Sequence, residues 1–184
     1  MSAAILLAAG ASTRLGEPKQ LAMLGSETLL ERSVRVAREA GFVPVVVVLG
    51  AAAEQIRERC DFGGAAVVVN EAWEEGMASS IRAGLRAVPA AVVGALVMTC
   101  DQPAVTAEHL RALASAGEVT ASTYAGRRGV PAYFPAALFR ELVELRGDAG
   151  ARELLLAAAT VELAGGELDV DTAADLAEAV RRYR

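Results

Sequence analysis

The chain has 184 residues and a formal net charge of −5; 54% of the residues are hydrophobic and only 4% are aromatic. The length predicts one domain, residues 1–184, with a sizeable core, and the negative charge argues against a broad nucleic-acid-binding surface, which needs a basic patch. Two cysteines without metal-binding spacing, no signal-peptide pattern and no apolar run of roughly 18 residues predict a cytoplasmic protein with no membrane partner.

Apolar runs alternate with helical patterns along the chain. The predicted strands are Ala4–Ala9, Val43–Leu49, Ala66–Val69, Ala95–Thr99, Val119–Tyr124, Ala132–Phe134 and a short segment at Val161–Leu163. Helical spacing of apolar positions is found at Leu29–Ala40, Glu54–Arg59, Ser79–Ala87, Glu108–Leu113, Ala136–Leu145, Ala149–Ala158 and Thr172–Arg182. The early strands are continuous apolar runs, which predicts an α/β fold with a mostly parallel sheet covered by helices on both faces. In such sheets ligands bind beyond the carboxyl ends of the strands.

The loop after the first predicted strand has the chemistry of a phosphate-binding loop. It begins at Gly10 and carries small residues together with two cations, Arg14 and Lys19. A loop without bulky side chains lets backbone N–H groups approach an anion, which the cations then neutralise. Five residues separate Gly10 from Gly16, and Gln20 follows Lys19, so neither the Walker A pattern nor the dinucleotide pattern G-x-G-x-x-G fits. The alternative is an ordinary glycine-rich turn.

The segment from Asn70 to Leu85 is a second candidate for substrate binding. Gly76 would allow close approach of the backbone, and Ser79 or Ser80 is expected to cap the helix that follows. A helix N-terminus with a free hydroxyl suits recognition of a base or ribose edge. Trp73, the only tryptophan, is as readily a packing residue as a substrate contact.

Asp101 ends a buried apolar strand and precedes Gln102 and Pro103. Mg²⁺ prefers one or two carboxylates completed by substrate phosphates and water, so Asp101 is a candidate metal ligand. Its alternative role is to cap the next helix, but Thr106 is better placed for that. His109, the only histidine, lacks the neighbours of a zinc site, and the cysteines are expected to be small core residues.

A second carboxylate is expected close to the last predicted helix. Asp169 and Asp171 alternate, so both would face one side of an extended chain. The alternative is that Asp171 or Thr172 caps the helix, with Asp175 in its first turn.

These segments resemble the MobA-like nucleotidyltransferases, and they occur in the family's order. The matching patterns are L-A-A-G-x-S-x-R-[LM]-G-x-P-K from Leu7, N-x-x-W-x-x-G-M-x-x-S-[IV]-x-x-G-L from Asn70, C-D-Q-P from Cys100, the turn around Arg128–Pro131, G-D-x-G-A-R from Gly147, and D-[IV]-D-T-x-x-D-L from Asp169. The resemblance implies a three-layer α/β/α sandwich of the Rossmann-like, GT-A-like nucleotidyltransferase kind. It also implies Mg²⁺ as cofactor, with Mn²⁺ as the alternative ion.

The resemblance also implies roles for individual residues. The implied nucleotide-binding residues are Leu7, Ala8, Ala9, Gly10, Ser12, Arg14, Lys19, Asn70, Gly76, Ser80 and Asp101. Asp101 and Asp171 would hold the metal, with Asp169 in reserve. Arg14 would offset charge on pyrophosphate and Lys19 would act at the α-phosphate, so both join Asp101 as catalytic residues.

The implied acceptor-binding residues are Arg127, Arg128 and Arg152, whose guanidinium groups match phosphate oxygens. The chain departs from the family's acceptor turn at Val130, where a His or Asn is usual. A hydrogen bond to the acceptor is therefore expected to be missing, which bears on the identity of that acceptor.

The branch that this chain resembles is the molybdenum-cofactor cytidylyltransferases. Such an enzyme transfers CMP from CTP to the terminal phosphate of molybdopterin, releases pyrophosphate, and supplies a molybdenum hydroxylase of the xanthine dehydrogenase type. In the family, L-A-A-G goes with cytosine and L-A-G-G with guanine, so the methyl group of Ala9 favours CTP by about 1–3 kcal/mol. The alternatives are a cytidylyltransferase for a sugar- or polyol-phosphate, and a non-catalytic nucleotide-binding chaperone for the cofactor.

Overall fold

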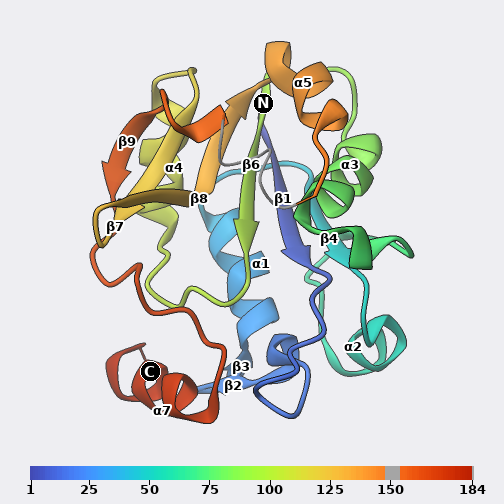
Figure 1. Ribbon diagram of the computed structural model, residues 1–184, viewed down its shortest axis with the longest axis vertical. Helices are drawn as coiled ribbons and strands as arrows, with labels where there is room; N and C mark the ends of the chain where they lie inside the picture. The colour runs from blue at the N-terminus through green and yellow to red at the C-terminus, as the bar shows by residue number, and fades with distance from the viewer. Residues whose placement is uncertain (148–153, 184) are drawn as a thin grey trace.

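The computed structural model describes residues 1–147 and 154–183. A seven-stranded sheet has the order β5-β4-β1-β6-β8-β7-β9 (Figure 1). Its strands are β1 (Ala3–Ala8), β4 (Val45–Leu49), β5 (Ala66–Val69), β6 (Gly94–Thr99), β7 (Thr120–Tyr124), β8 (Arg127–Pro135) and β9 (Ala159–Glu162). Every neighbouring pair is parallel except those that involve β8, which runs antiparallel to β6 and β7. The predicted mostly parallel sheet is confirmed.

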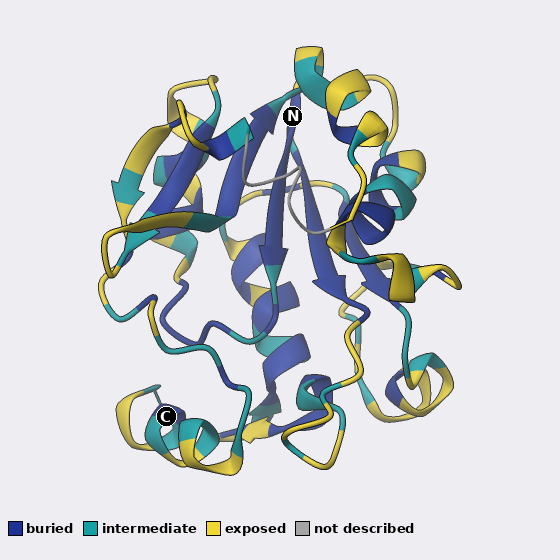
Figure 2. Cartoon of the chain, viewed as in Figure 1, coloured by how far each residue is buried: buried dark blue, intermediate teal, exposed yellow. Residues whose placement is uncertain are grey.

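Helices cover both faces of this sheet, as the continuous apolar strands require. One face packs against α1 (Leu29–Glu39), α2 (Ala53–Arg59) and α4 (Ala107–Ser115), and the other against α3 (Met77–Ala87) and α5 (Phe139–Glu144). Strand β1 shows the division: Leu6 lies in the cluster with α1, whereas Ile5 lies in the cluster with α3. Figure 2 shows the buried strands between helices whose outer sides are exposed. The three-layer α/β/α sandwich is therefore confirmed.

A third, smaller apolar cluster lies below the carboxyl ends of the strands. The short hairpin of β2 (Met23–Leu24) and β3 (Glu27–Thr28) packs there with helix α7 (Ala173–Tyr183). In Figure 1, β1 and β6 point down towards these elements. The hairpin is absent from the sequence-based prediction, because strands of two residues are too short to show an apolar period.

Three 3-10 turns complete the described structure: η1 (Lys19–Leu21), η2 (Trp73–Glu75) and η3 (Ala136–Leu138), the last leading directly into α5. The first half of the predicted helix Ala149–Ala158 lies outside the described residues; of its second half, Leu154 and Leu155 are helical and the next two residues form a turn. None of the described helices is both long and apolar enough to cross a bilayer.

The start of α3 corrects one prediction. The helix begins at Met77 after Gly76, which has a φ of 100°, so neither serine caps it. Ser79 instead donates its hydroxyl to the Gly76 carbonyl at 2.8 Å. The positive φ explains the early start, because glycine can turn sharply where a residue with a side chain is strained. The predicted cap of α4 is confirmed: Thr106 accepts a hydrogen bond from the His109 N–H at 3.2 Å.

Candidate functional site

The carboxyl ends of β1 and β6 and a segment near the C-terminus meet at one edge of the sheet. The predicted phosphate loop leaves β1, and Asp101 lies just beyond β6. The backbone N–H of Val170 donates to the Asp101 carbonyl at 2.8 Å, which brings the next residue, Asp171, to the same place. Thr172 caps α7 together with Asp175, through hydrogen bonds of 2.7–3.2 Å, so the carboxylate of Asp171 remains available for other contacts.

Lys19 lies between two carboxylates. Its Nζ is 2.7 Å from Asp101 Oδ2 and 2.7 Å from Asp171 Oδ1. Arg14 approaches from the outside and places Nη2 2.7 Å from Asp171 Oδ2. The Lys19 side chain is 17% exposed, and burial alone would lower the pKa of its ammonium. The adjacent Asp101 and Asp171 outweigh burial and hold that pKa above its usual value.

The two carboxylates fit a divalent cation with incomplete protein coordination. Because both bond to one nitrogen atom, the two bonding oxygens are no further apart than twice 2.7 Å. Two hard oxygen ligands beside a phosphate loop match the preference of Mg²⁺, which keeps phosphate and water ligands. The described residues contain no group of three or more His, Cys, Asp or Glu arranged to hold a metal, so substrate would have to supply further ligands.

Asp169 lies near this pair but has a different environment. Burial, and then the charges of Asp101 and Asp171, raise the pKa of the Asp169 carboxyl to about 6. In the described structure the direct bonds to Lys19 come from Asp101 and Asp171. Of the two alternating carboxylates, Asp171 is therefore the one placed for a shared cation with Asp101.

The Gln20 side chain supports the predicted phosphate loop through hydrogen bonds to its backbone, a role that the sequence does not reveal. Its side chain is buried, and Nε2 donates to the carbonyls of Ala8 at 2.7 Å and Gly10 at 3.2 Å. Ser12 accepts the Lys19 backbone N–H at 3.0 Å and has a φ of 53°, so the loop folds back on itself. No local signal distinguishes Gln20 from an exposed polar residue after a cation; only the three-dimensional fold shows that it is buried.

A cavity of about 360 Å³ opens beside Lys19, between the phosphate loop and the start of α3. Most of the residues predicted to bind nucleotide line it: Leu7, Ala8, Ala9, Gly10, Lys19, Gly76, Ser80 and Asp101. A neighbouring cavity of about 180 Å³ is lined by Gly10, Ser12, Thr13, Arg14, Lys19 and Asp171. Lys19 and Gly10 are common to both cavities, which together provide an apolar compartment and a charged one.

Two residues shape the wall of the larger cavity. Asn70 lies behind it and donates from Nδ2 to the hydroxyls of Ser79 at 2.8 Å and Ser80 at 3.0 Å, which fixes Ser80 at the lining. Trp73 lines the cavity and also packs tightly at the end of β4: a Cβ added to Gly50 would lie 2.7 Å from the Trp73 Cβ. Trp73 is thus both a packing residue and part of the lining.

Two of the predicted acceptor residues, Arg127 and Arg128, lie outside both of these cavities. Arg127 and Arg128 are exposed at the start of β8, and the Arg127 guanidinium lies 5.9 Å from the centre of the Tyr124 ring. Burial, and to a smaller extent the charges of Asp169 and Asp101, raise the pKa of the Tyr124 hydroxyl. The Tyr124 hydroxyl donates to the Val130 carbonyl at 3.2 Å. Arg152 lies outside the described residues.

The other chemically notable side chains are not arranged for catalysis. Cys100 is buried, and burial raises the pKa of its thiol to about 12, which leaves it un-ionised and inert. His109 is buried and its Nε2 lies 2.8 Å from the Ser122 hydroxyl.

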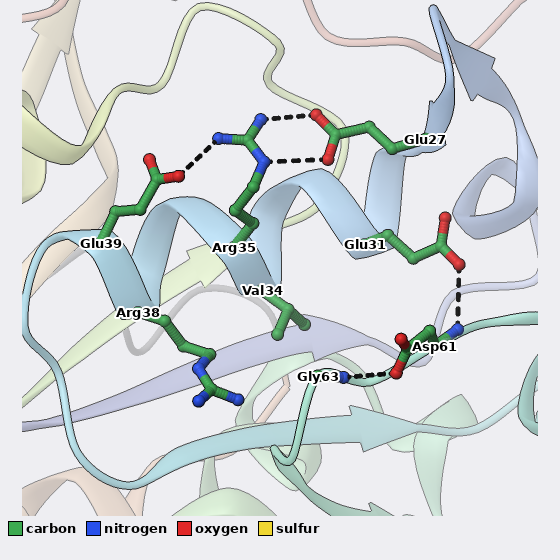
Figure 3. Close-up of a pocket in the computed structure, with 8 residues that line it drawn as sticks. All are labelled: Glu27, Glu31, Val34, Arg35, Arg38, Glu39, Asp61 and Gly63. Atoms are coloured by element: carbon green, nitrogen blue, oxygen red, sulfur yellow. Dashed lines mark hydrogen bonds and ion pairs between the residues drawn. The ribbon is translucent and has the colours of Figure 1, made fainter.

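Another hollow, of about 580 Å³, lies along α1 (Figure 3), and neither Asp101 nor Asp171 lines it. Its charges are largely satisfied internally. Arg35 bonds to Glu27 and Glu39, and Glu31 accepts the Asp61 backbone N–H at 2.9 Å. This self-paired surface has no chemistry that matches a reaction.

Comparisons with known proteins give a matching family and related sequences. The model of the MobA-like NTP transferase domain matches residues 4–162. The chain is 36% identical over 163 residues to nicotine blue oxidoreductase of Paenarthrobacter nicotinovorans, covering 82% of this chain and 79% of that protein. It is 38% identical over 108 residues to a probable molybdenum cofactor guanylyltransferase of Opitutus terrae, covering 57% of this chain and 50% of that protein.

Solved structures share the whole fold. The crystal structure of Rv0371c from Mycobacterium tuberculosis is 33% identical with a TM-score of 0.86, over 98% of this chain and 97% of that chain. A second structure of that protein, in complex with manganese, is 31% identical with a TM-score of 0.82, over 98% of each chain.

Proposed function

This chain belongs to the MobA-like NTP transferase family, and from that premise we propose that it transfers CMP from CTP to the terminal phosphate of molybdopterin and releases pyrophosphate. The observation that carries the proposal is the cluster of Lys19, Asp101 and Asp171 at the mouth of a cavity lined by the phosphate loop. We also propose that residues 1–184 form one domain, since α7 packs on the β2–β3 hairpin.

The chain's own residues would act by position and charge rather than by a covalent intermediate. Backbone groups at Gly10 and the Ser12 hydroxyl would hold the β- and γ-phosphates. Arg14 would offset the charge that collects on the departing pyrophosphate, and Lys19 would stabilise the α-phosphate. An oxygen of the acceptor phosphate attacks the α-phosphorus, and the bond from that phosphorus to the β-phosphate oxygen breaks.

Asp101 and Asp171 would hold Mg²⁺ or Mn²⁺, which when bound supplies positive charge that aligns and neutralises phosphate oxygens. The structure of Rv0371c in complex with manganese supports a divalent ion as cofactor. Asp101 and Asp171 already lie on a common cation, Lys19, which supports the choice of this pair.

Ala9 supports cytosine as the base, because it lines the cavity and its methyl group takes space that a purine would need. Arg127 and Arg128 are exposed at the start of β8 and would bind an anionic acceptor. The relative named as a probable molybdenum cofactor guanylyltransferase supports a molybdenum-related acceptor. A molybdenum hydroxylase of the xanthine dehydrogenase type would then receive the product.

Three other functions predict different results. A cytidylyltransferase for a sugar- or polyol-phosphate would use the same donor site with another acceptor. A non-catalytic chaperone would bind nucleotide without releasing pyrophosphate, and the complete set of Lys19, Asp101 and Asp171 counts against it. The relative named nicotine blue oxidoreductase suggests a redox activity as a third alternative. Such an activity would not need the paired carboxylates of Asp101 and Asp171.

The first experiment is calorimetric binding of CTP, GTP and ATP with Mg²⁺ to the wild type and to Asp101→Asn. A magnesium-dependent preference for CTP that the substitution abolishes would support the donor site, and pyrophosphate release on adding molybdopterin or a sugar phosphate would identify the acceptor. Absence of nucleotide binding would overturn the proposal. Binding without pyrophosphate release with any acceptor would leave the chaperone as the better function.

A further inference from the structure

Lys19 Nζ lies 2.7 Å from both Asp101 and Asp171, the two carboxylates that would hold a divalent cation. We propose that Lys19 is a specificity-determining residue, an internal cation that keeps Mg²⁺ or Mn²⁺ off Asp101 and Asp171 until a nucleoside triphosphate draws its ammonium away. The site would then admit the divalent ion efficiently only together with nucleotide. This inference rests on the proposed function, because it assigns a phosphate ligand to Lys19 and a metal to the two carboxylates.

Three of the four carboxylate oxygens of Asp101 and Asp171 have a cationic partner within the chain. Lys19 Nζ donates hydrogen bonds to Asp101 Oδ2 and Asp171 Oδ1, each at 2.7 Å. Arg14 donates to Asp171 Oδ2 at the same distance. Both oxygens of Asp171 therefore have a cationic partner. A metal ion arriving alone has to break these charge-assisted hydrogen bonds and leave a mostly buried ammonium without its partners.

The position of Lys19 gives its ammonium a second destination. Lys19 lines both the larger cavity and the smaller one that Ser12 and Arg14 share. Its backbone N–H is fixed on Ser12 at 3.0 Å, so moving the charge requires a change of side-chain rotamer and no movement of the loop. Triphosphate oxygens in these cavities would replace the carboxylates as partners, and the freed carboxylates would then take the metal.

This exchange makes metal and nucleotide interdependent. If nucleotide bound alone, Asp101 and Asp171 would lose their cationic partner while the charge of Asp169 also acts on them. If metal bound alone, Lys19 would lose its two carboxylate partners. By linkage, nucleotide must tighten metal binding by the same factor by which metal tightens nucleotide binding. Removing the charge of Lys19 should weaken that coupling and, in particular, strengthen the binding of metal alone.

The test is Mn²⁺ binding without nucleotide, followed by the electron paramagnetic resonance signal of the free ion. Lys19→Gln removes the internal cation, and Lys19→Arg keeps a cation as the matched control. We expect Lys19→Gln to bind Mn²⁺ alone about tenfold more tightly than the wild type, since a competing ion pair is gone. Lys19→Arg should bind as weakly as the wild type. Equal Mn²⁺ affinity in the wild type and a folded Lys19→Gln variant would overturn the inference.

A second variant keeps the inference testable if Lys19→Gln does not fold, which a thermal unfolding measurement would detect. Arg14→Gln frees Asp171 Oδ2 at an exposed position, and we expect a smaller gain in Mn²⁺ affinity, about threefold. No gain in that variant would then count against the inference.

The proposed function and the inference can fail independently. If the wild type binds CTP but releases no pyrophosphate with any acceptor, and Lys19→Gln still gains Mn²⁺ affinity, only the proposed reaction is wrong. If CTP binds and pyrophosphate is released while the Mn²⁺ affinities stay equal, only the inference is wrong.

Discussion

The backbone N–H of Val170 donates to the carbonyl oxygen of Asp101 at 2.8 Å. This bond joins the residue after β6 to a segment near the C-terminus. It thereby fixes the position of the next residue, Asp171. Val170 is fully buried in the cluster that anchors α7, so the bond is protected from water. Asp171 is therefore held in position next to Lys19, although it lies in a segment without regular secondary structure.

We expect Lys19→Ala and Asp101→Asn each to lower the rate of pyrophosphate release by about 10²–10³, as for loss of one group that stabilises charge in a transition state. Both side chains line the cavity rather than the apolar core, so both variants should remain folded, which circular dichroism checks. Glu108→Gln, an exposed carboxylate in the first turn of α4, is the matched control. Near-wild-type turnover in either variant would remove that residue from the mechanism.

We expect Gln20→Leu to weaken CTP binding about tenfold and to cost about 1–3 kcal/mol of stability, because leucine cannot donate to the carbonyls of Ala8 and Gly10. Calorimetric CTP titration and chemical denaturation measure the two effects. The same substitution at Gln55, which is exposed on α2, should change neither. Unchanged nucleotide affinity in Gln20→Leu would show that the loop keeps its shape without the brace.

We expect Ala9→Gly to shift the ratio of kcat/KM for CTP over GTP towards GTP by about 10-fold or more, since one methyl group in a pocket is worth roughly 1–3 kcal/mol. The residue lines the cavity, so the change adds space where the base would lie. Ala51→Gly, a partly exposed alanine outside both cavities, is the control for the effect of an added glycine. A preference for CTP that survives Ala9→Gly would place base selection elsewhere in the cavity.

We expect the protein to lose stability on mild acidification through His109. Burial lowers the pKa of this imidazole below its usual value, so the unfolded chain takes up the proton before the folded protein does. The contribution is complete above the unfolded pKa of about 6.5 and is lost as the pH falls through the window below it. Denaturation of the wild type and of His109→Gln at pH 7.5 and 5.5 should show a larger loss in the wild type. Parallel losses would mean that His109 is not the titrating group.

The sequence predicts the layers well and the site only in part. Continuous apolar runs such as Val45–Leu49 reveal buried strands, because burial on both faces leaves no polar alternation. The loop cations and Asp101 are also visible, since their chemistry is local. What spacing could not show is that Lys19 bonds to partners 82 and 152 residues away. That pairing, like the burial of Gln20, depends on how distant segments pack.

The order of the segments along the chain also sets the order in which the site can form. Every strand of the sheet precedes Asp171, so a growing chain can bury its apolar core while Lys19 still has Asp101 as its sole partner in the carboxylate pair. The second carboxylate is synthesised after the scaffold that receives it. A product of interrupted translation could therefore have a formed sheet and an open phosphate loop, yet lack the pair that would retain a metal–nucleotide complex.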